Sequence, residues 1–395
     1  MDKVSTLELP SSVKDNYRGF SCPFEPFRED LVPFVIQEYA RGISCRFVSE
    51  LGKYLTHQDK RIIETISPWL EGSNIPGVGW DPCFGNIYRA MHSDNFEHHA
   101  TIFAALAIHL SSFGLQGTWE VELSSPVRLR WGNLLLPIAS HVSVDCKEEV
   151  AFIETRLSST NQSTFNIRKI GTDWVCEGLD VIPKQTNYQT DIAMLPKSAL
   201  FMPDLEEFVS KAVGIIDAPI VKVFDDSLDL INKHVPEYIP WIRRSVHNVF
   251  LLEKGDHMID SGSVEHYLGL VHFSSYPVSL IIAELLVHEA SHQHMNILLK
   301  LGAVDDGSDR NLYYSPPVDK NRTLHLILAA YHAFANVLIF YRTCRDTGVS
   351  DKRECDRQEK LLLPWLSQLE KPLIQNSALT AIGNALWQPL YERLH

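Results

Sequence analysis

A pair of histidines with helical spacing is the strongest chemical signal in the sequence. His288 and His292 enclose the motif His-Glu-Ala-Ser-His, with Glu289 directly after the first histidine. Residues four positions apart lie on one face of an α-helix, so both imidazoles can approach a single metal ion. The sequence therefore predicts a metal centre of the HExxH type.

The surrounding residues favour a helix over a chance match. An apolar run precedes His288, Pro277 stands where the first turn of a helix tolerates proline, and Gly302 follows as a stop signal. A helix is thus predicted from Pro277 to Gly302. His294 lies two residues beyond His292, points to another side of that helix, and is not expected to bind the metal.

Two histidines hold a catalytic metal poorly, so a third ligand is expected. The downstream glutamate of gluzincin peptidases is missing, because no glutamate occurs between Glu289 and Glu354. Residues 295–304 do not supply the glycine and histidine that metzincins have at fixed short spacing after the second ligand, and residues 307–309 only loosely resemble the aspartate-bearing turn of aspzincins.

The remaining candidates are His325 and His332, seven residues apart on a predicted apolar helix at 322–334. This spacing puts them on nearly the same face at different heights. One of the two is expected to complete the site.

Three regions of different periodicity are predicted to position these residues. Residues 1–115 and 200–395 are mainly helical, and the second of these regions carries the HExxH helix. Residues 116–199 alternate polar and apolar side chains, which predicts a small antiparallel sheet or barrel. The fold class is therefore α+β, mainly helical with a central antiparallel β region. The alternation is clearest at 119–123, 127–131, 150–153, 165–170 and 174–176.

Shorter segments carry their own predictions. Helices are expected at 29–55 and 95–113, with a long Gly- and Pro-rich loop at 76–88 between them. Two strands at 249–253 and 264–273 are predicted to form a short hairpin that leads into the metal helix.

Composition limits the classes of function. A net charge of −13 over 395 residues argues against nucleic acid as the main partner. The apolar runs are too short for a membrane span, and the first twenty residues lack the pattern of a signal peptide. Seven cysteines without a CxxC motif indicate neither a disulfide framework nor a zinc knuckle. A cytoplasmic location without a membrane partner is expected.

The segments around and after the histidine pair resemble one enzyme family, the 2-oxoglutarate-dependent HExxH-type peptide β-hydroxylases. These enzymes modify ribosomally made precursor peptides in bacterial natural-product pathways. The resemblance covers roughly residues 260–345, and the HExxH motif joined to a Tyr-Ser-Pro segment and the next helix makes it specific. It rests on His-Glu-Ala-Ser-His-Gln at 288–293, Leu-Tyr-Tyr-Ser-Pro at 312–316, Arg322, Ala-Phe at 333–334 and Phe-Tyr-Arg at 340–342.

This resemblance implies iron(II), 2-oxoglutarate and O₂ rather than zinc and water. His288 and His292 carry over as iron ligands. Many members have histidine at the position of Ala329, whereas this sequence has His332 one turn later and His325 one turn earlier. His332 is expected as the third ligand because it lies in the best-matched segment, with His325 as the alternative. Three protein ligands leave positions open for the keto acid and O₂.

The other site residues follow from what the keto acid needs. Its distal carboxylate calls for a cation, preferably arginine, and Arg322 is the first choice with Arg342 as the second. Ser315 and Tyr314 can add hydroxyl hydrogen bonds. Glu289 is expected to hydrogen-bond a ligand, a bound water or the substrate. Because the ligands come from helices, the fold is not expected to be a double-stranded β-helix.

The leading hypothesis is an Fe(II)/2-oxoglutarate dioxygenase that hydroxylates a side-chain β-carbon of a precursor peptide. A zinc metallopeptidase is the alternative, with zinc as the metal and Glu289 as the general base that activates water. A peptide-binding module with a structural metal is a third hypothesis, and it predicts no turnover.

Overall fold

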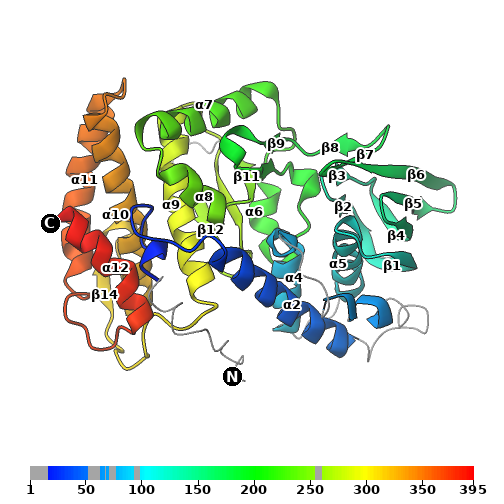
Figure 1. The fold of residues 1–395 in the computed structure, drawn as a ribbon, viewed down its shortest axis with the longest axis horizontal. Coiled ribbons are helices and arrows are strands. Elements are labelled where there is room, and N and C mark those ends of the chain that lie inside the picture. The colour runs from blue at the N-terminus through cyan, green and yellow to red at the C-terminus, as the bar shows by residue number, and fades with distance from the viewer. Residues whose placement is uncertain (1–16, 52–62, 67, 71–76, 93–97, 254–259) are drawn as a thin grey trace.

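The computed structural model describes residues 17–51, 63–66, 68–70, 77–92, 98–253 and 260–395. It confirms the predicted α+β class, with helices predominant, one antiparallel and one mixed five-stranded sheet, and no closed barrel among these residues (Figure 1). The α-helices that can be given bounds are α2 (Leu31–Leu51), α4 (Cys83–Met91), α5 (His99–Ser112), α6 (Glu206–Ser210), α7 (Ala218–His234), α8 (Tyr238–Ser245), α9 (Ser279–Leu298), α10 (Leu324–Asp346), α11 (Lys352–Glu370) and α12 (Ala381–Leu394), and residues 63–66 and 68–70 are helical as well. Short 3₁₀ helices include η1 (Tyr17–Phe20), η2 (Val78–Trp80) and η6 (Pro316–Val318).

The strands of the described residues form two five-stranded sheets and two smaller ones. The first five-stranded sheet, in spatial order, has β1 (Gly117–Val127), β4 (Ala139–Lys147), β5 (Val150–Ser158), β6 (Asn161–Ile170) and β7 (Asp173–Val175). The second has β12 (Ser261–Ser263), β13 (Leu270–Ser274), β11 (Asn248–Leu252), β10 (Ile192–Met194) and β9 (Lys184–Gln185). The smaller sheets contain β2 (Arg130–Trp131), β3 (Leu134–Leu135) and β8 (Asp180–Val181), and β14 (Tyr313–Ser315) with β15 (Lys320–Arg322).

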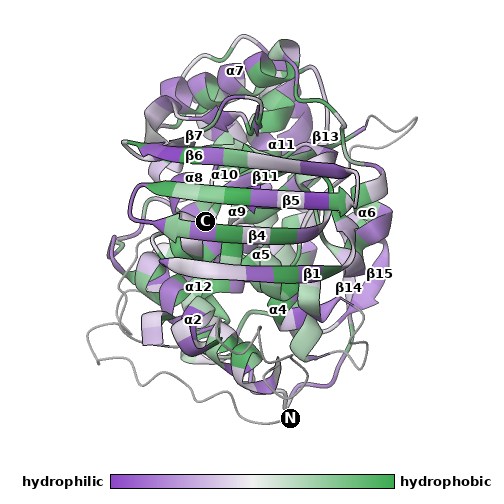
Figure 2. Ribbon diagram, turned by 90° about the vertical axis from the view of Figure 1, so that its right-hand side faces the viewer, coloured by the Kyte–Doolittle hydropathy of each residue, from purple (hydrophilic) through white to green (hydrophobic). Residues whose placement is uncertain are grey.

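The first sheet is the predicted antiparallel region. In β1 the side chains of Trp119, Val121 and Leu123 are buried while their neighbours are exposed, as the alternation predicts. Figure 2 shows the long strands lying across one face of the molecule, and α5 packs behind them against β1 and β4. The predicted strand at 127–131 is shorter than expected, because only Arg130 and Trp131 form β2.

The helices of the N-terminal region agree with the prediction where they are described. Residues 31–51 form α2 and residues 99–112 form α5, which ends before Gly114 at a positive φ of 112°. The parts of these predictions at 52–55 and 95–97 lie outside the described residues.

The predicted loop at 76–88 is wrong for most of its length, because η2 and α4 form there. The carboxylate of Asp81 accepts a hydrogen bond from the backbone N–H of Cys83 at 2.9 Å, which satisfies an N–H at the start of α4. Position 85 of this helix requires glycine, because a Cβ there would stand only 2.1 Å from the ring of Tyr267. The glycine thus serves close packing and not a turn.

The predicted hairpin before the metal helix is also corrected. β11 and β13 are parallel neighbours, whereas β12 pairs antiparallel with β13. The predicted second strand began too early, because residues 264–269 form a turn that ends at Gly269 with φ 78°. The hairpin therefore exists between β12 and β13, and β13 leads into α9.

The predicted HExxH helix is α9, which starts at Ser279, two residues after Pro277, and ends at Leu298. It packs against α7, α8 and α10 in the largest apolar core. In the described part of the chain, α10 has the length and composition of a membrane span, but 78% of its most apolar 18-residue stretch is buried inside the protein. It is thus packed as a core helix. Arg322, predicted on this helix, lies in β15 before it.

Candidate metal centre

The two motif histidines converge as predicted. Their Nε2 atoms lie 3.2 Å apart and their ring centroids 4.8 Å apart, with the planes at 75°. Two nitrogens that each lie about 2.1 Å from one ion, at tetrahedral or octahedral angles, are about 3.0–3.4 Å apart. The pair therefore has the spacing of two ligands of a common metal.

The protonation state of the pair suits metal binding. Burial lowers the pKa of His292 to about 4, and the charge of Arg322 acts in the same direction. Burial also lowers the pKa of His288 well below its usual value, and the neighbouring His292 and His332 add to this effect. Both rings are neutral near pH 7, so a nitrogen lone pair is available without displacing a proton from an imidazolium.

Packing fixes the orientation of the pair. The ring of Phe334 meets His288 edge to face at 4.9 Å, and Trp365 packs on Phe334 at 5.4 Å. Gln293, next to His292, accepts a hydrogen bond from the backbone N–H of Gly269 at 2.9 Å and donates one to the carbonyl of Leu270 at 2.8 Å. These contacts join α9 both to α10 and to the start of β13.

The predicted third ligand is held by other partners. Nε2 of His332 lies 2.8 Å from the carbonyl oxygen of Ser21 and 3.0 Å from that of Phe20, so this nitrogen carries the proton. Its Nδ1 is buried and has no hydrogen-bond partner in the described part of the chain. His332 is close enough to the pair to influence the pKa of His288. Among the described residues, however, no three His, Cys, Asp or Glu side chains form a metal-binding cluster.

His325, the alternative third ligand, is half-buried on α10 and completes no such cluster within the described ranges either. His294 behaves as expected for a residue on another side of the helix. Its ring stacks on Trp241 at 4.1 Å, and its Nε2 donates to the Trp241 carbonyl at 2.9 Å. It is a core histidine.

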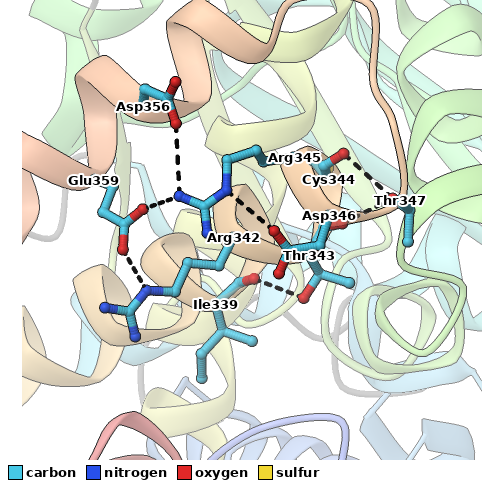
Figure 3. Close-up of polar contacts among 9 residues, drawn as sticks. All are labelled: Ile339, Arg342, Thr343, Cys344, Arg345, Asp346, Thr347, Asp356 and Glu359. Carbon is cyan, nitrogen blue, oxygen red and sulfur yellow. Dashed lines mark hydrogen bonds and ion pairs between the residues drawn. The ribbon is translucent and has the colours of Figure 1, made fainter.

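The two predicted arginines have different surroundings. Arg322 is half-buried near His292, and no acidic side chain of the described residues pairs with it. Arg342 lies ten residues beyond His332 on α10, and its Nε is 2.7 Å from a carboxylate oxygen of Glu359 on α11 (Figure 3). Arg345 reaches the same carboxylate. Arg342 thus belongs to an ion-pair cluster between α10 and α11, and only Arg322 accompanies the histidines.

The two residues predicted to donate hydroxyl hydrogen bonds, Tyr314 and Ser315, also have different surroundings. Tyr314 is 44% exposed and its hydroxyl donates to Asp319 at 2.8 Å, so it is a surface residue. Ser315 is fully buried, and its Oγ has no hydrogen-bond partner among the residues that the structure describes. Of the two, Ser315 has a polar atom available for a ligand.

Glu289 is buried at 1% exposure, and its Oε2 lacks a hydrogen-bond partner in the described residues. Burial raises the pKa of its carboxyl to about 7, while the hydroxyls of Ser261 and Ser263 on β12 oppose this rise. The side chain therefore lies beside β12. The segment Ser261–Ser263 resembles the peptide β-hydroxylases only weakly, and no signal in the sequence points to the carbonyls of Phe20 and Ser21.

Comparison with protein-family models and with curated proteins found no match to this chain.

Proposed function

We propose that this protein is an Fe(II)/2-oxoglutarate-dependent dioxygenase that hydroxylates a side-chain β-carbon of a ribosomally made peptide in the cytoplasm. The observation that carries the proposal is the convergent pair His288 and His292 beside Arg322, a cation with no acidic partner among the described residues. A dianionic keto acid requires a metal for one end and a cation for the other.

The residues of the chain have separate tasks in this proposal. Iron bound by the histidine pair would supply oxidation of a C–H bond by O₂, coupled to conversion of 2-oxoglutarate to succinate and CO₂. Arg322 holds the distal carboxylate of the keto acid, and the buried hydroxyl of Ser315 is available to the same ligand. Phe334 and Trp365 keep bulk water from one side of His288.

His332 remains the proposed third ligand. Its Nε2–H points to the carbonyls of Phe20 and Ser21, so the lone pair is on Nδ1, which is buried without a hydrogen-bond partner in the described chain. A carbonyl that accepts from the other ring nitrogen is the usual support of a metal-binding histidine. Binding through Nδ1 requires the ring to move toward the pair.

A zinc metallopeptidase is the second candidate, and one observation favours it. A carboxyl with a pKa of about 7 is suited to a general base, and Glu289 has such a value. The hydroxyls of Ser261 and Ser263 on β12 stabilise the charged form of this carboxyl and so oppose the rise of its pKa.

The experiment is reconstitution with iron(II) without oxygen, followed by 2-oxoglutarate, O₂ and candidate precursor peptides. The proposal predicts that succinate forms and that one peptide gains the mass of one oxygen atom. Zinc-dependent cleavage of the same peptides without O₂ would support the peptidase. A fully metal-loaded protein that makes no succinate would contradict the dioxygenase.

A further inference from the structure

A second candidate binding site lies at the junction between the N-terminal half and the second sheet. It is a cleft of about 540 Å³, and none of its lining residues belongs to α9 or α10. This volume is within the range of sites that take drug-sized ligands or short peptide segments, roughly 300–1,000 Å³. The lining comes from η2, α5, β2, β6 and β7, and from residues of α8 and around β9 and β11.

The cleft is basic in a protein that is acidic overall. Four basic side chains and two acidic ones line it, although the chain carries a net charge of −13. One of the two carboxylates, Asp81, pairs with Arg130 at 3.0 Å and accepts the Cys83 N–H at 2.9 Å. Burial opposes its ionisation, but the charges of Arg130 and His109 hold the pKa of Asp81 at about 2. Asp81 thus remains an anion that fixes Arg130 in place.

Two lysines of the cleft are available to an anion. Lys169 is half-buried with its Nζ 5.8 Å from the centre of the Trp174 ring, and no carboxylate of the described residues pairs with it. Lys184 has only 3.6 Å contacts with Asp173 and Asp191, both well exposed. Exposed pairs of this kind contribute little, so a ligand carboxylate can replace them.

Aromatic side chains give the cleft rigid walls. Trp80 stacks on His247 with a centroid distance of 4.0 Å, and the indole N–H of Trp174 donates to the carbonyl of Ser112 at 2.9 Å. Trp80 is 7% and Trp174 3% exposed, so only a small part of each ring is accessible, and this part is held in place at little cost in side-chain entropy. Such walls beside ammonium groups suit a peptide that carries both carboxylates and apolar side chains.

Hydrogen bonds connect the cleft to the metal helix. Trp80 packs against Gly269, where a Cβ would stand 2.6 Å from the indole ring. The carbonyl of Gly269 accepts from the N–H groups of His247 and Asn248, and its own N–H donates to Gln293, the neighbour of His292. A ligand that contacts Trp80 would therefore lie against a ring that packs on Gly269, in the short segment that positions α9.

We propose that this cleft binds an acidic segment of the peptide substrate and holds it relative to the histidine pair. Carboxylates of the peptide would pair with Lys169 and Lys184 while its apolar side chains lie against Trp80 and Trp174. The role of this peptide as a substrate rests on the proposed function, but its binding in the cleft can be measured without any turnover.

The test is fluorescence anisotropy with a short labelled peptide of glutamate, glycine and phenylalanine, and with its twin that has glutamine for glutamate. The glutamate peptide is expected to bind at least about tenfold more tightly than its twin, and added salt should remove the difference. The double variant Lys169→Glu/Lys184→Glu should lose this preference. The control Lys360→Glu/Lys371→Glu makes the same change of charge at exposed positions on and beside α11, and should keep it.

Equal binding of the two peptides, or an unchanged preference after charge reversal, would overturn the proposal. Tighter binding of adenosine monophosphate than of the glutamate peptide would also overturn it, in favour of a nucleotide site. The single variant Lys169→Gln and a thermal melt guard against a folding defect. A protein that binds the glutamate peptide as expected but makes no succinate would retain the cleft site and refute the dioxygenase.

Discussion

At the scale of single residues, spacing predicted that the two histidines converge and could not predict what surrounds them. His288 and His292 converge because four residues make about one helical turn. The partners of His332 are carbonyls at positions 20 and 21, more than 300 residues away, and no local pattern links such positions. The difference between Arg322 and Arg342 likewise depends on Glu359, which belongs to another helix.

That difference between the arginines can be measured. Arg322→Gln is expected to raise the KM for 2-oxoglutarate at least about tenfold without changing metal content, because a charged hydrogen-bond partner is lost. Arg342→Gln should leave this KM within about twofold and lower the free energy of unfolding by roughly 0.5–1 kcal/mol, as expected for a partly exposed ion pair. Similar effects of the two variants on KM would contradict the assignment of Arg322.

Glu289 separates the two candidate functions. In the dioxygenase it does not act on metal-bound water, so Glu289→Gln should retain succinate formation within about tenfold. In a peptidase the same variant should lose activity by about a thousandfold or more, since general base and electrostatic assistance are both removed. Initial rates of both reactions, measured on the same preparations with equal metal content, distinguish these outcomes.

At the scale of elements, apolar periodicity predicted where helices and strands lie in the sequence better than it predicted which strands pair. The run of apolar residues before His288 produced α9, and the alternation at 119–123 produced β1. The error at 264–273 arose because an apolar turn and a buried strand look alike in sequence. The loop at 76–88 was wrongly predicted because Gly85 allows the close approach of Tyr267 and does not mark a turn, which sequence alone does not show.

Gly269 stands directly before β13, and its N–H donates to Gln293 on the helix that carries the histidine pair. Its φ of 78° opposes a side chain, and so does the Trp80 ring, which lies 2.6 Å from the point where a Cβ would stand. Gly269→Ala should lower the free energy of unfolding by at least about 2 kcal/mol, through left-handed backbone strain and overpacking. Gly214→Ala is the control, because nothing lies within 4 Å of its Cβ position, and a change of less than about 0.5 kcal/mol is expected. Urea unfolding curves of both variants provide the comparison.

At the scale of the whole molecule, the sequence predicted the order of helical, β and helical regions but not how their cores meet. One apolar core is built from the helices α7 through α12, together with η1 and part of α2. A second core is built from α4, α5 and the first sheet. The basic cleft lies where these parts meet, and its residues come from segments more than 150 positions apart. Such a junction depends on tertiary packing, which composition does not encode.

Buried neutral histidines make the whole fold sensitive to acid. Burial lowers the pKa of His272 to about 4, with Asp260 opposing this effect, and its ring lies between Phe250 and Phe208. In the unfolded chain His272 takes up a proton near pH 6.5, whereas in the folded protein it stays neutral until about pH 4. The free energy of unfolding is therefore fully retained above pH 6.5 and falls as the pH drops toward 4. This loss amounts to about 3 kcal/mol. His272→Phe should therefore reduce the loss of stability between pH 7 and 4.5, as measured by urea midpoints. An unchanged pH dependence would contradict the neutral state of His272.

The most direct test of the account is a titration with iron(II) in the absence of oxygen. It would compare the wild-type chain with His288→Ala/His292→Ala and with the exposed control His92→Ala. The account predicts about one tightly bound iron for the wild type and for His92→Ala, and at least a hundredfold weaker binding for the double variant with its fold retained by circular dichroism. Equal iron binding by the double variant, or no binding by the wild type, would contradict a metal centre at this histidine pair.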